Sequence, residues 1–190
     1  VEQIGEYNDS DIEQSSHDNY ANVYQNGESN DSEIIQDGLL GGKNKANVTQ
    51  SGDDNESLID QYGNGLVGND ATVNQTGDDN FSDIGQIGAG NKATVDQTGD
   101  ENHSEIGQAG VGNNADVDQL GDLNESYITQ SGNLIPLLGN RAVVLQDGTS
   151  NISTIDQNGS ANYANISQAG LSNTSNVDQT GSGNVANVIQ

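Results

Sequence analysis

The chain has 190 residues, 30% hydrophobic and 4% aromatic, with no Met, Trp or Cys, and its 29 acidic against four basic residues give a net charge of −25. Such a composition excludes a large conventional apolar core, disulfides and zinc–thiolate sites, and taken alone it is typical of a disordered chain. It also argues against nucleic acid as a partner and against membrane insertion, since the four bases form no stripe and no apolar run could cross a bilayer.

A unit of eleven residues, N-x-[A/S]-x-[V/I]-x-Q-x-G-x-x, nevertheless recurs from one end of the chain to the other. A partial copy at 1–5 comes first and 16 further copies follow, with all 17 Gln residues at the Gln position. From Asn to Gln the fixed residues lie at every second position, which is the period of a β-strand. In chain order the predicted strands are 8–14, 19–25, 30–36, 44–50, 55–61, 69–75, 80–86, 91–97, 102–108, 113–119, 124–130, 140–146, 151–157, 162–168, 173–179 and 184–190.

The segments between these strands are predicted to be turns. Of the 16 turns, 15 contain a Gly two residues after the Gln, and Ser16 is the exception. Glycine suits the positive φ that tight reversals require. Regular Gly together with abundant Asn, Asp and Ser also opposes a helix.

The small residue of the unit alternates strictly between Ser and Ala, and in most copies Ile accompanies Ser while Val accompanies Ala. Thus Ala93 and Val95 are followed by Ser104 and Ile106. The structural period is therefore 22 residues, and two strands with two turns form one rung. We predict an all-β, flattened two-sheet β-solenoid (cross-β) of about eight rungs, a single domain over 1–190, with Ala strands in one sheet and Ser strands in the other.

Stacked rungs place each Asn and Gln over the same residue of the next rung, where the amides can form a ladder, a column of side chains each hydrogen-bonded to the next. The predicted Asn ladders contain Asn19, Asn44, Asn69, Asn91, Asn113, Asn140, Asn162 and Asn184 in the Ala strands, and Asn30, Asn55, Asn80, Asn102, Asn124, Asn151 and Asn173 in the Ser strands. The predicted Gln ladders contain Gln25, Gln50, Gln75, Gln97, Gln119, Gln146, Gln168 and Gln190, and Gln36, Gln61, Gln86, Gln108, Gln130, Gln157 and Gln179.

Acidic residues gather in the turns that follow the Ala strands, where Asp53, Asp78, Asp100 and Asp122 should stack. Like charges one rung apart repel by about 1 kcal/mol in water. We interpret these four residues as gatekeepers that slow premature assembly. The alternative is a column of calcium sites, because clustered carboxylates are the ligands that this hard cation prefers.

Three apolar turns, at 39–43, 64–68 and 133–139, are longer than the others. All follow a Ser strand, so they should lie at the same edge of the solenoid. One interpretation is a lateral contact between filaments or with a surface, and the other is loop insertion that the fold tolerates.

No catalytic constellation is present. The segment Gly63-Asn-Gly-Leu-Val-Gly68 spells G-x-G-x-x-G, but it joins a strand to a strand and no helix follows. His17 and His103 belong to different rungs, without a third partner. We therefore predict that the protein is not an enzyme and has neither a catalytic residue nor a cofactor.

The segment Gln86-Ile-Gly-Ala-Gly-Asn-Lys-Ala-Thr-Val-Asp-Gln97 has the pattern Q-x-G-x-x-N-x-A-x-x-x-Q, which resembles the curlin repeat. The resemblance covers essentially the whole chain, although Asn stands where many repeats of that family have Ser. It implies a subunit of curli, the extracellular functional amyloid of bacterial biofilms. By resemblance, the partners are other copies of the chain, a surface nucleator subunit and an outer-membrane secretion pore, and the fibres serve adhesion and the biofilm matrix.

The first and last rungs are where we expect one copy of the chain to join the next. No capping segment flanks the repeats within this sequence, so we expect open end strands that template a further copy, the alternative being caps that lie outside it. Head-to-tail stacking of like ends does not close and gives a filament. The competing hypothesis is a soluble β-solenoid, an adhesin or ice-binding module, that stays monomeric.

Overall fold

The computed structural model describes residues 1–39, 43–132 and 138–190, and these residues form strands and turns without a helix. The strands are β1 (Glu2–Ile4), β2 (Asp9–Gln14), β3 (Tyr20–Asn26), β4 (Asp31–Gly38), β5 (Lys45–Ser51), β6 (Glu56–Gly63), β7 (Asp70–Thr76), β8 (Phe81–Ala89), β9 (Lys92–Thr98), β10 (His103–Val111), β11 (Asn114–Leu120), β12 (Glu125–Gly132), β13 (Arg141–Thr149), β14 (Ile152–Ser160), β15 (Tyr163–Leu171), β16 (Thr174–Ser182) and β17 (Val185–Ile189). Each begins one residue after a repeat Asn, apart from β1, which belongs to the partial copy.

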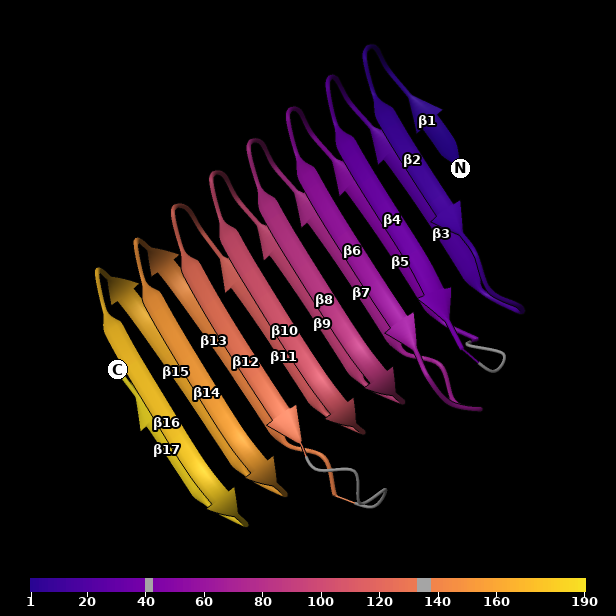
Figure 1. Cartoon of the computed structure of the whole chain (residues 1–190). Coiled ribbons are helices and arrows are strands. Elements are labelled where there is room, and N and C mark those ends of the chain that lie inside the picture. Colours follow the sequence, from indigo (N-terminus) through magenta and orange to yellow (C-terminus); the bar gives the residue numbers. More distant parts are fainter. Residues whose placement is uncertain (40–42, 133–137) are drawn as a thin grey trace.

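The strands form two parallel sheets that lie face to face (Figure 1). The nine odd-numbered strands follow one another in the first sheet, and the eight even-numbered strands do so in the second. The chain therefore changes sheet at every turn and advances by one strand position per rung. The predicted two-sheet β-solenoid of about eight rungs is confirmed.

The register pairs like residues with like. In the odd sheet Ala115 of β11 pairs with Ala93 and Ala142 of its two neighbours. In the even sheet Ser104 of β10 pairs with Ser82 and Ser126. The alternation of Ala and Ser along the sequence thus becomes a separation between the two sheets, as predicted.

The core is a thin layer between the sheets. Its apolar members are the repeated Val and Ile of the inward positions and the Ala of the odd strands, with Val95 and Ala93 at 0% exposure. The repeated Asn, Ser and Gln side chains share this layer and are as deeply buried as the apolar ones. Since the sheets approach closely, small and β-branched side chains fill the space, and no aromatic side chain is found among the buried residues of the described chain.

Turn glycines have a stricter role than the sequence indicated. Gly99 has a φ of 115°, and a Cβ there would collide with the carbonyl group of Gly121 in the next rung. The even strands from β4 onward, and β13 and β15 of the odd sheet, continue to the Gly of this repeat position or beyond it. Gly88 thus pairs with Gly110 inside the ladder of β8 and β10. The predicted strands ended too early here, because stacking identical turns allows backbone pairing to continue past the Gln.

We expect Gly99→Ala to lower the free energy of unfolding by about 2 kcal/mol or more, since the methyl group is strained by φ and meets backbone. Gly107→Ala is the matched control, because Gly107 lies within a strand and has open space where a Cβ would stand. It should raise stability by about 0.5–1 kcal/mol. Urea unfolding of the unassembled chain measures the free energy of unfolding of both variants. Equal losses of stability would contradict the stricter role assigned to the turn glycine.

Candidate functional site: the stacked polar columns

The Gln side chains form two continuous columns through the molecule. In each, the Nε2 group donates to the Oε1 atom of the Gln in the next rung towards the C-terminus, at 2.7–3.1 Å. The odd column runs from Gln3 to Gln190 and the even column from Gln14 to Gln179. All the predicted Gln positions lie in these two columns.

Each interior Gln amide uses both of its N–H groups. Gln97 accepts from Gln75 at 3.0 Å and donates to Gln119 at 2.9 Å. Its second N–H donates at 3.0 Å to the carbonyl oxygen of Phe81, which belongs to the opposite sheet. The Gln columns therefore join rung to rung and also join the two sheets, at 0–2% exposure for most members.

The Asn side chains of the even strands form a second kind of column. Asn102 donates from both its backbone N–H and its Nδ2 group to the Oδ1 atom of Asn80, each at 3.1 Å. Its Nδ2 group also donates at 2.7 Å to the carbonyl oxygen of the turn glycine Gly121. The same arrangement links Asn30, Asn55, Asn80, Asn102, Asn124, Asn151 and Asn173.

The Asn side chains of the odd strands are linked mainly through the backbone. Asn91 donates its backbone N–H to Oδ1 of Asn69 at 3.1 Å, while its Nδ2 group donates to carbonyl oxygens of Ile87 and Gly110. The Oδ1 to backbone link continues through Asn19, Asn44, Asn69, Asn91, Asn113, Asn140, Asn162 and Asn184. Only in the last odd rungs does the side chain join in, since Nδ2 of Asn162 donates to Asn140 and Nδ2 of Asn184 donates to Asn162, each at 3.1 Å. The sequence could not distinguish this pattern from the side-chain ladder of the even strands.

The two kinds of column run in opposite directions. A Gln donates towards the C-terminal end, as Gln97 does to Gln119. An Asn donates towards the N-terminal end, as Asn102 does to Asn80. Every cut between rungs therefore exposes Gln donors and Asn acceptors on one face, and Gln acceptors and Asn donors on the other.

The Ser hydroxyls of the even sheet are the exception to this pairing. In the described chain seven Ser residues have a buried hydroxyl oxygen without a hydrogen-bond partner, namely Ser10, Ser32, Ser57, Ser82, Ser104, Ser126 and Ser153. A buried unpaired hydroxyl costs about 1–3 kcal/mol. The Ser column thus distinguishes the two sheets at a cost in stability.

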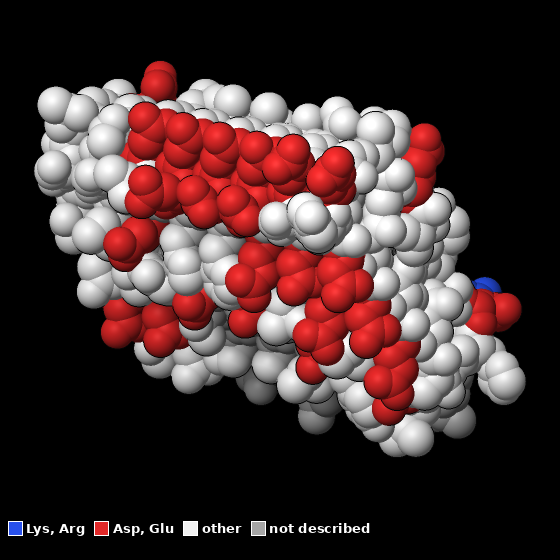
Figure 2. All heavy atoms as spheres, turned by 90° about the horizontal axis from the view of Figure 1, so that it is seen from above, with Lys and Arg blue, Asp and Glu red and all other residues white. Residues whose placement is uncertain are grey.

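The four predicted gatekeeper acids lie one above another at the edge where the odd strands end, and Figure 2 shows rows of carboxylates along this edge. Their carboxylates also make hydrogen bonds that the sequence did not reveal. Oδ1 of Asp78 accepts the backbone N–H of Asp53 at 2.9 Å, and Asp100 and Asp122 repeat this at 3.0 Å. The sequence feature that indicates these hydrogen bonds is an Asp directly after the turn Gly. Its carboxylate accepts a backbone N–H of the turn in the preceding rung.

The calcium alternative gains no support from this arrangement. Among residues 1–39, 43–132 and 138–190, no group of three or more His, Asp or Glu side chains is placed to hold a metal ion. Each column carboxylate points at the backbone of the preceding rung, so neighbouring carboxylates do not converge on a common point.

The opposite edge of the solenoid carries the longer turns (Figure 1). Its described apolar side chains are strongly exposed, with Leu39 at 64%, Leu66 at 85% and Leu138 at 65%. Residues 40–42 and 133–137 of the predicted long turns lie outside the described residues. The solenoid therefore has one acidic edge and one edge of apolar turns.

The outward carboxylates of the sheets are crowded. Burial raises the pKa of Asp118 on β11, and repulsion from Asp96, Asp116 and Asp147 raises it further. On β8, burial likewise raises the pKa of Asp83, with added repulsion from Glu105. Their surroundings disfavour the charged form of both groups, so these carboxylates oppose the fold when ionised.

Comparison with known proteins gives the family. The family model for the Curlin associated repeat matches residues 17–52, 41–77, 68–99, 77–110, 110–133 and 139–170. The chain belongs to the curlin-repeat family. Each matched segment covers two or three consecutive strands, so each contributes strands to both sheets. A comparison with curated proteins finds no match.

The described part of this curlin-repeat protein contains no helix with the length and apolar character needed to cross a bilayer.

We expect Gln97→Ala to lower the free energy of unfolding by about 2–5 kcal/mol, because it leaves the buried Oε1 atom of Gln119 without its donor, removes one of the acceptors of Gln75 and opens a cavity in the core. Thr98→Ala, at the exposed neighbouring position, is the control and should change stability by no more than about 0.5 kcal/mol. Urea unfolding followed by circular dichroism tests the pair. A Gln97 variant as stable as its control would show that the column contributes little.

We expect Asp118→Asn to stabilise the fold at pH 7. The folded-state pKa of Asp118 is raised, so its carboxylate opposes folding above that pKa, and the penalty disappears as pH falls through it towards the ordinary value of about 3.9. Unfolding midpoints of the variant and the wild type should therefore converge at low pH. A difference between the two unfolding midpoints that grows as the pH falls would contradict a raised folded-state pKa of Asp118.

Proposed function

We propose that the chain is a structural subunit of extracellular curli-type amyloid fibres and that copies stack head to tail by extending both sheets and all four amide columns. The fibres would serve adhesion, surface colonisation and the biofilm matrix. Membership of the curlin-repeat family supports this class of function. The chain would act as a building block and not as an enzyme.

The opposite directions of the Gln and Asn columns are the observation that carries the proposal. The face of a rung towards the C-terminal end offers Gln Nε2 donors and Asn Oδ1 acceptors. The face towards the N-terminal end offers Gln Oε1 acceptors and Asn N–H donors. A copy that arrives head to tail meets the same partners that each interior rung already has. Backbone groups at the strand edges pair in the same step, as between neighbouring strands inside one chain.

Reversed stacking would break the like-on-like register. Turning one copy over reverses its strand direction, so the strands at the junction would be antiparallel and each Gln would lie opposite an Asn, whereas inside the chain the strands are parallel and each Gln lies opposite a Gln. The fibre is therefore polar, with two chemically different ends. A heterologous contact of this kind continues without closing and gives a filament.

The cellular setting follows from the family. We propose that the chain leaves the cell unfolded through an outer-membrane secretion pore and that a surface nucleator subunit starts assembly outside. The acidic edge fits this setting, since repulsion between unassembled chains at a net charge of −25 slows association before export. The contact that joins two copies contains no cofactor.

The direct test is incubation of the purified chain, followed by thioflavin T fluorescence and electron microscopy. We expect a lag phase, unbranched fibres and removal of the lag by preformed seeds. In addition, fluorescent subunits added to a labelled seed should extend one end faster than the other. Chains that persist as folded monomers would instead identify the soluble solenoid module, and equal growth at both ends would contradict the polar junction.

Assembly should depend most on the weakly charged end of the chain. Residues 148–190 contain two acidic residues, Asp156 and Asp178, so rungs from this region stack with little repulsion. Deletion of 173–190 is expected to lengthen the lag several-fold. Deletion of 151–172 is the matched control, because it also removes one acid but keeps the repeat register and the last strands. Equal lags for the two deletions would contradict a special role of residues 173–190.

A further inference from the structure

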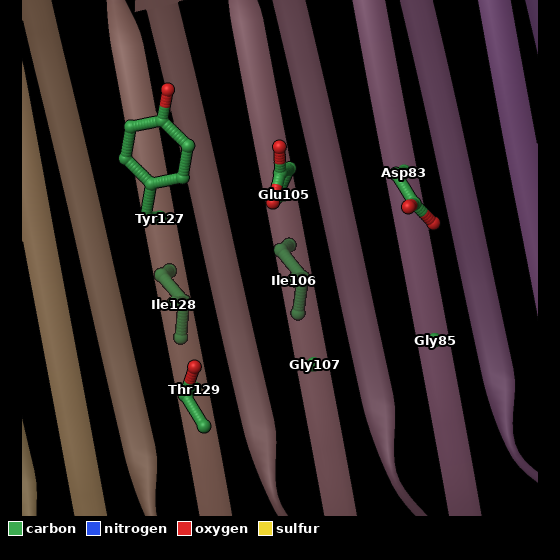
Figure 3. Close-up of a pocket in the computed structure, with 8 residues that line it drawn as sticks. All are labelled: Asp83, Gly85, Glu105, Ile106, Gly107, Tyr127, Ile128 and Thr129. Atoms are coloured by element: carbon green, nitrogen blue, oxygen red, sulfur yellow. The ribbon is translucent and has the colours of Figure 1, made fainter.

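The outer face of the even sheet contains a hollow over two neighbouring strands (Figure 3). Its floor is formed by Gly85 of β8 and Gly107 of β10, which pair in register at the same outward position. The flanking strands carry Asp60 and Thr129 at this position, so side chains rise on both sides. The hollow has two adjoining parts, of about 350 Å³ and about 330 Å³, and both lie over these two glycines.

The fold does not require these two glycines. Their φ values are not positive, and a Cβ on either would have no neighbour within 4 Å. A Gly inside a strand costs about 0.5–1 kcal/mol relative to Ala. Unlike the turn glycines, they bring no turn geometry or close packing in return, and their structural effect is to keep the surface open.

One end of the hollow is acidic and aromatic. Asp83, Glu105 and Tyr127 line it from three successive strands. Tyr127 lies 5.6 Å from the ring of His103, which stacks on Phe81 at 4.8 Å, so the aromatic wall is supported by its neighbours. An aromatic ring beside two carboxylates is a favourable environment for an organic cation.

The other end of the hollow is apolar. Ile87 and Ala109 line it, four residues further along β8 and β10. At about 3.3 Å per residue, the two ends are about 13 Å apart. The glycine floor between them is flat and bears no side chain. A ligand that spans the hollow thus meets carboxylates at one end and hydrocarbon at the other.

The acidic end has one basic neighbour in its own sheet, His103, whose Nε2 atom lies 2.8 Å from Oε1 of Glu105. No even strand of the described chain contains Lys or Arg, whereas Lys45, Lys92 and Arg141 belong to odd strands in the opposite sheet. Burial and repulsion from Glu105 and Asp60 raise the pKa of Asp83, and His103 offsets only part of this rise. Two carboxylates thus share one imidazole, and a bound cation would balance the second negative charge.

We propose that this hollow binds an amphipathic organic monocation, an amine carried on a flat apolar body. The ammonium group lies between Asp83 and Glu105 beside the ring of Tyr127. The apolar body lies over Gly85 and Gly107 and ends against Ile87 and Ala109. The hollow lies within one chain and uses neither end rung, so binding is independent of fibre formation.

Equilibrium dialysis with tryptamine, in parallel on unassembled chain and on fibres, tests the proposal. We expect saturable binding of one equivalent per chain in both forms. Indole-3-propionate, which carries the same ring and a negative charge, should bind at least tenfold more weakly. Absence of saturable tryptamine binding, or equal binding of the two probes, would overturn the proposal.

Two pairs of variants separate shape from charge. Gly85→Thr with Gly107→Thr fills the floor with strand-favouring residues and should weaken tryptamine at least tenfold, while Ser167→Thr on the opposite sheet should not. The expected rise in unfolding midpoint shows that this loss is not due to unfolding.

For charge, Asp83→Asn with Glu105→Gln should weaken binding at least tenfold. Asp11→Asn with Glu13→Gln removes two charges from the same sheet at β2 and should change affinity by no more than twofold. Unchanged tryptamine affinity in the Thr variant of the two glycines, or in the variant without the two carboxylates, would contradict the proposed binding site.

Discussion

The pairing of buried side-chain amides between rungs is the constraint on which the rest of the molecule depends. A Gln such as Gln97 has two N–H groups and one oxygen in a layer without water, and each must find a partner there. The identical amides one rung away on either side supply two of these partners, and the opposite sheet supplies the third. This requirement fixes the parallel register, the constant spacing of Asn and Gln, and the glycines that let successive turns stack.

The same constraint explains how a chain with the composition of a disordered protein is ordered. Only alternate positions face the interior, and they accept a short list of residues: Asn, Ala or Ser, Val or Ile, and Gln. The outward positions and the turns carry the acids, the few bases and the aromatic side chains, so a high net charge does not enter the core. Stability comes from repeated hydrogen bonds and a thin β-branched layer instead of a large apolar core.

The periodicity was sufficient to predict the strands, the two sheets and the columns, since these depend only on which residues recur at which spacing. It could not give the direction of the amide hydrogen bonds, the acceptance of backbone N–H groups by Asp78, or the unpaired hydroxyl of Ser104, because these depend on atomic positions. The hollow does have a counterpart in the sequence, because Gly85 and Gly107 are 22 residues apart at a position where the other repeats have a side chain.

The opposed directions of the amide columns also have an electrostatic consequence. Gln oxygens face the N-terminal end of the solenoid and Asn oxygens face the C-terminal end, as the bonds of Gln97 and Asn102 show. Side-chain dipoles in the two sets therefore point in opposite senses and largely cancel along the axis. In an α-helix, aligned peptide dipoles leave partial charges at the termini. Here the side-chain amides of each added rung contribute little net axial dipole, so these columns can lengthen without an amide dipole that grows with them.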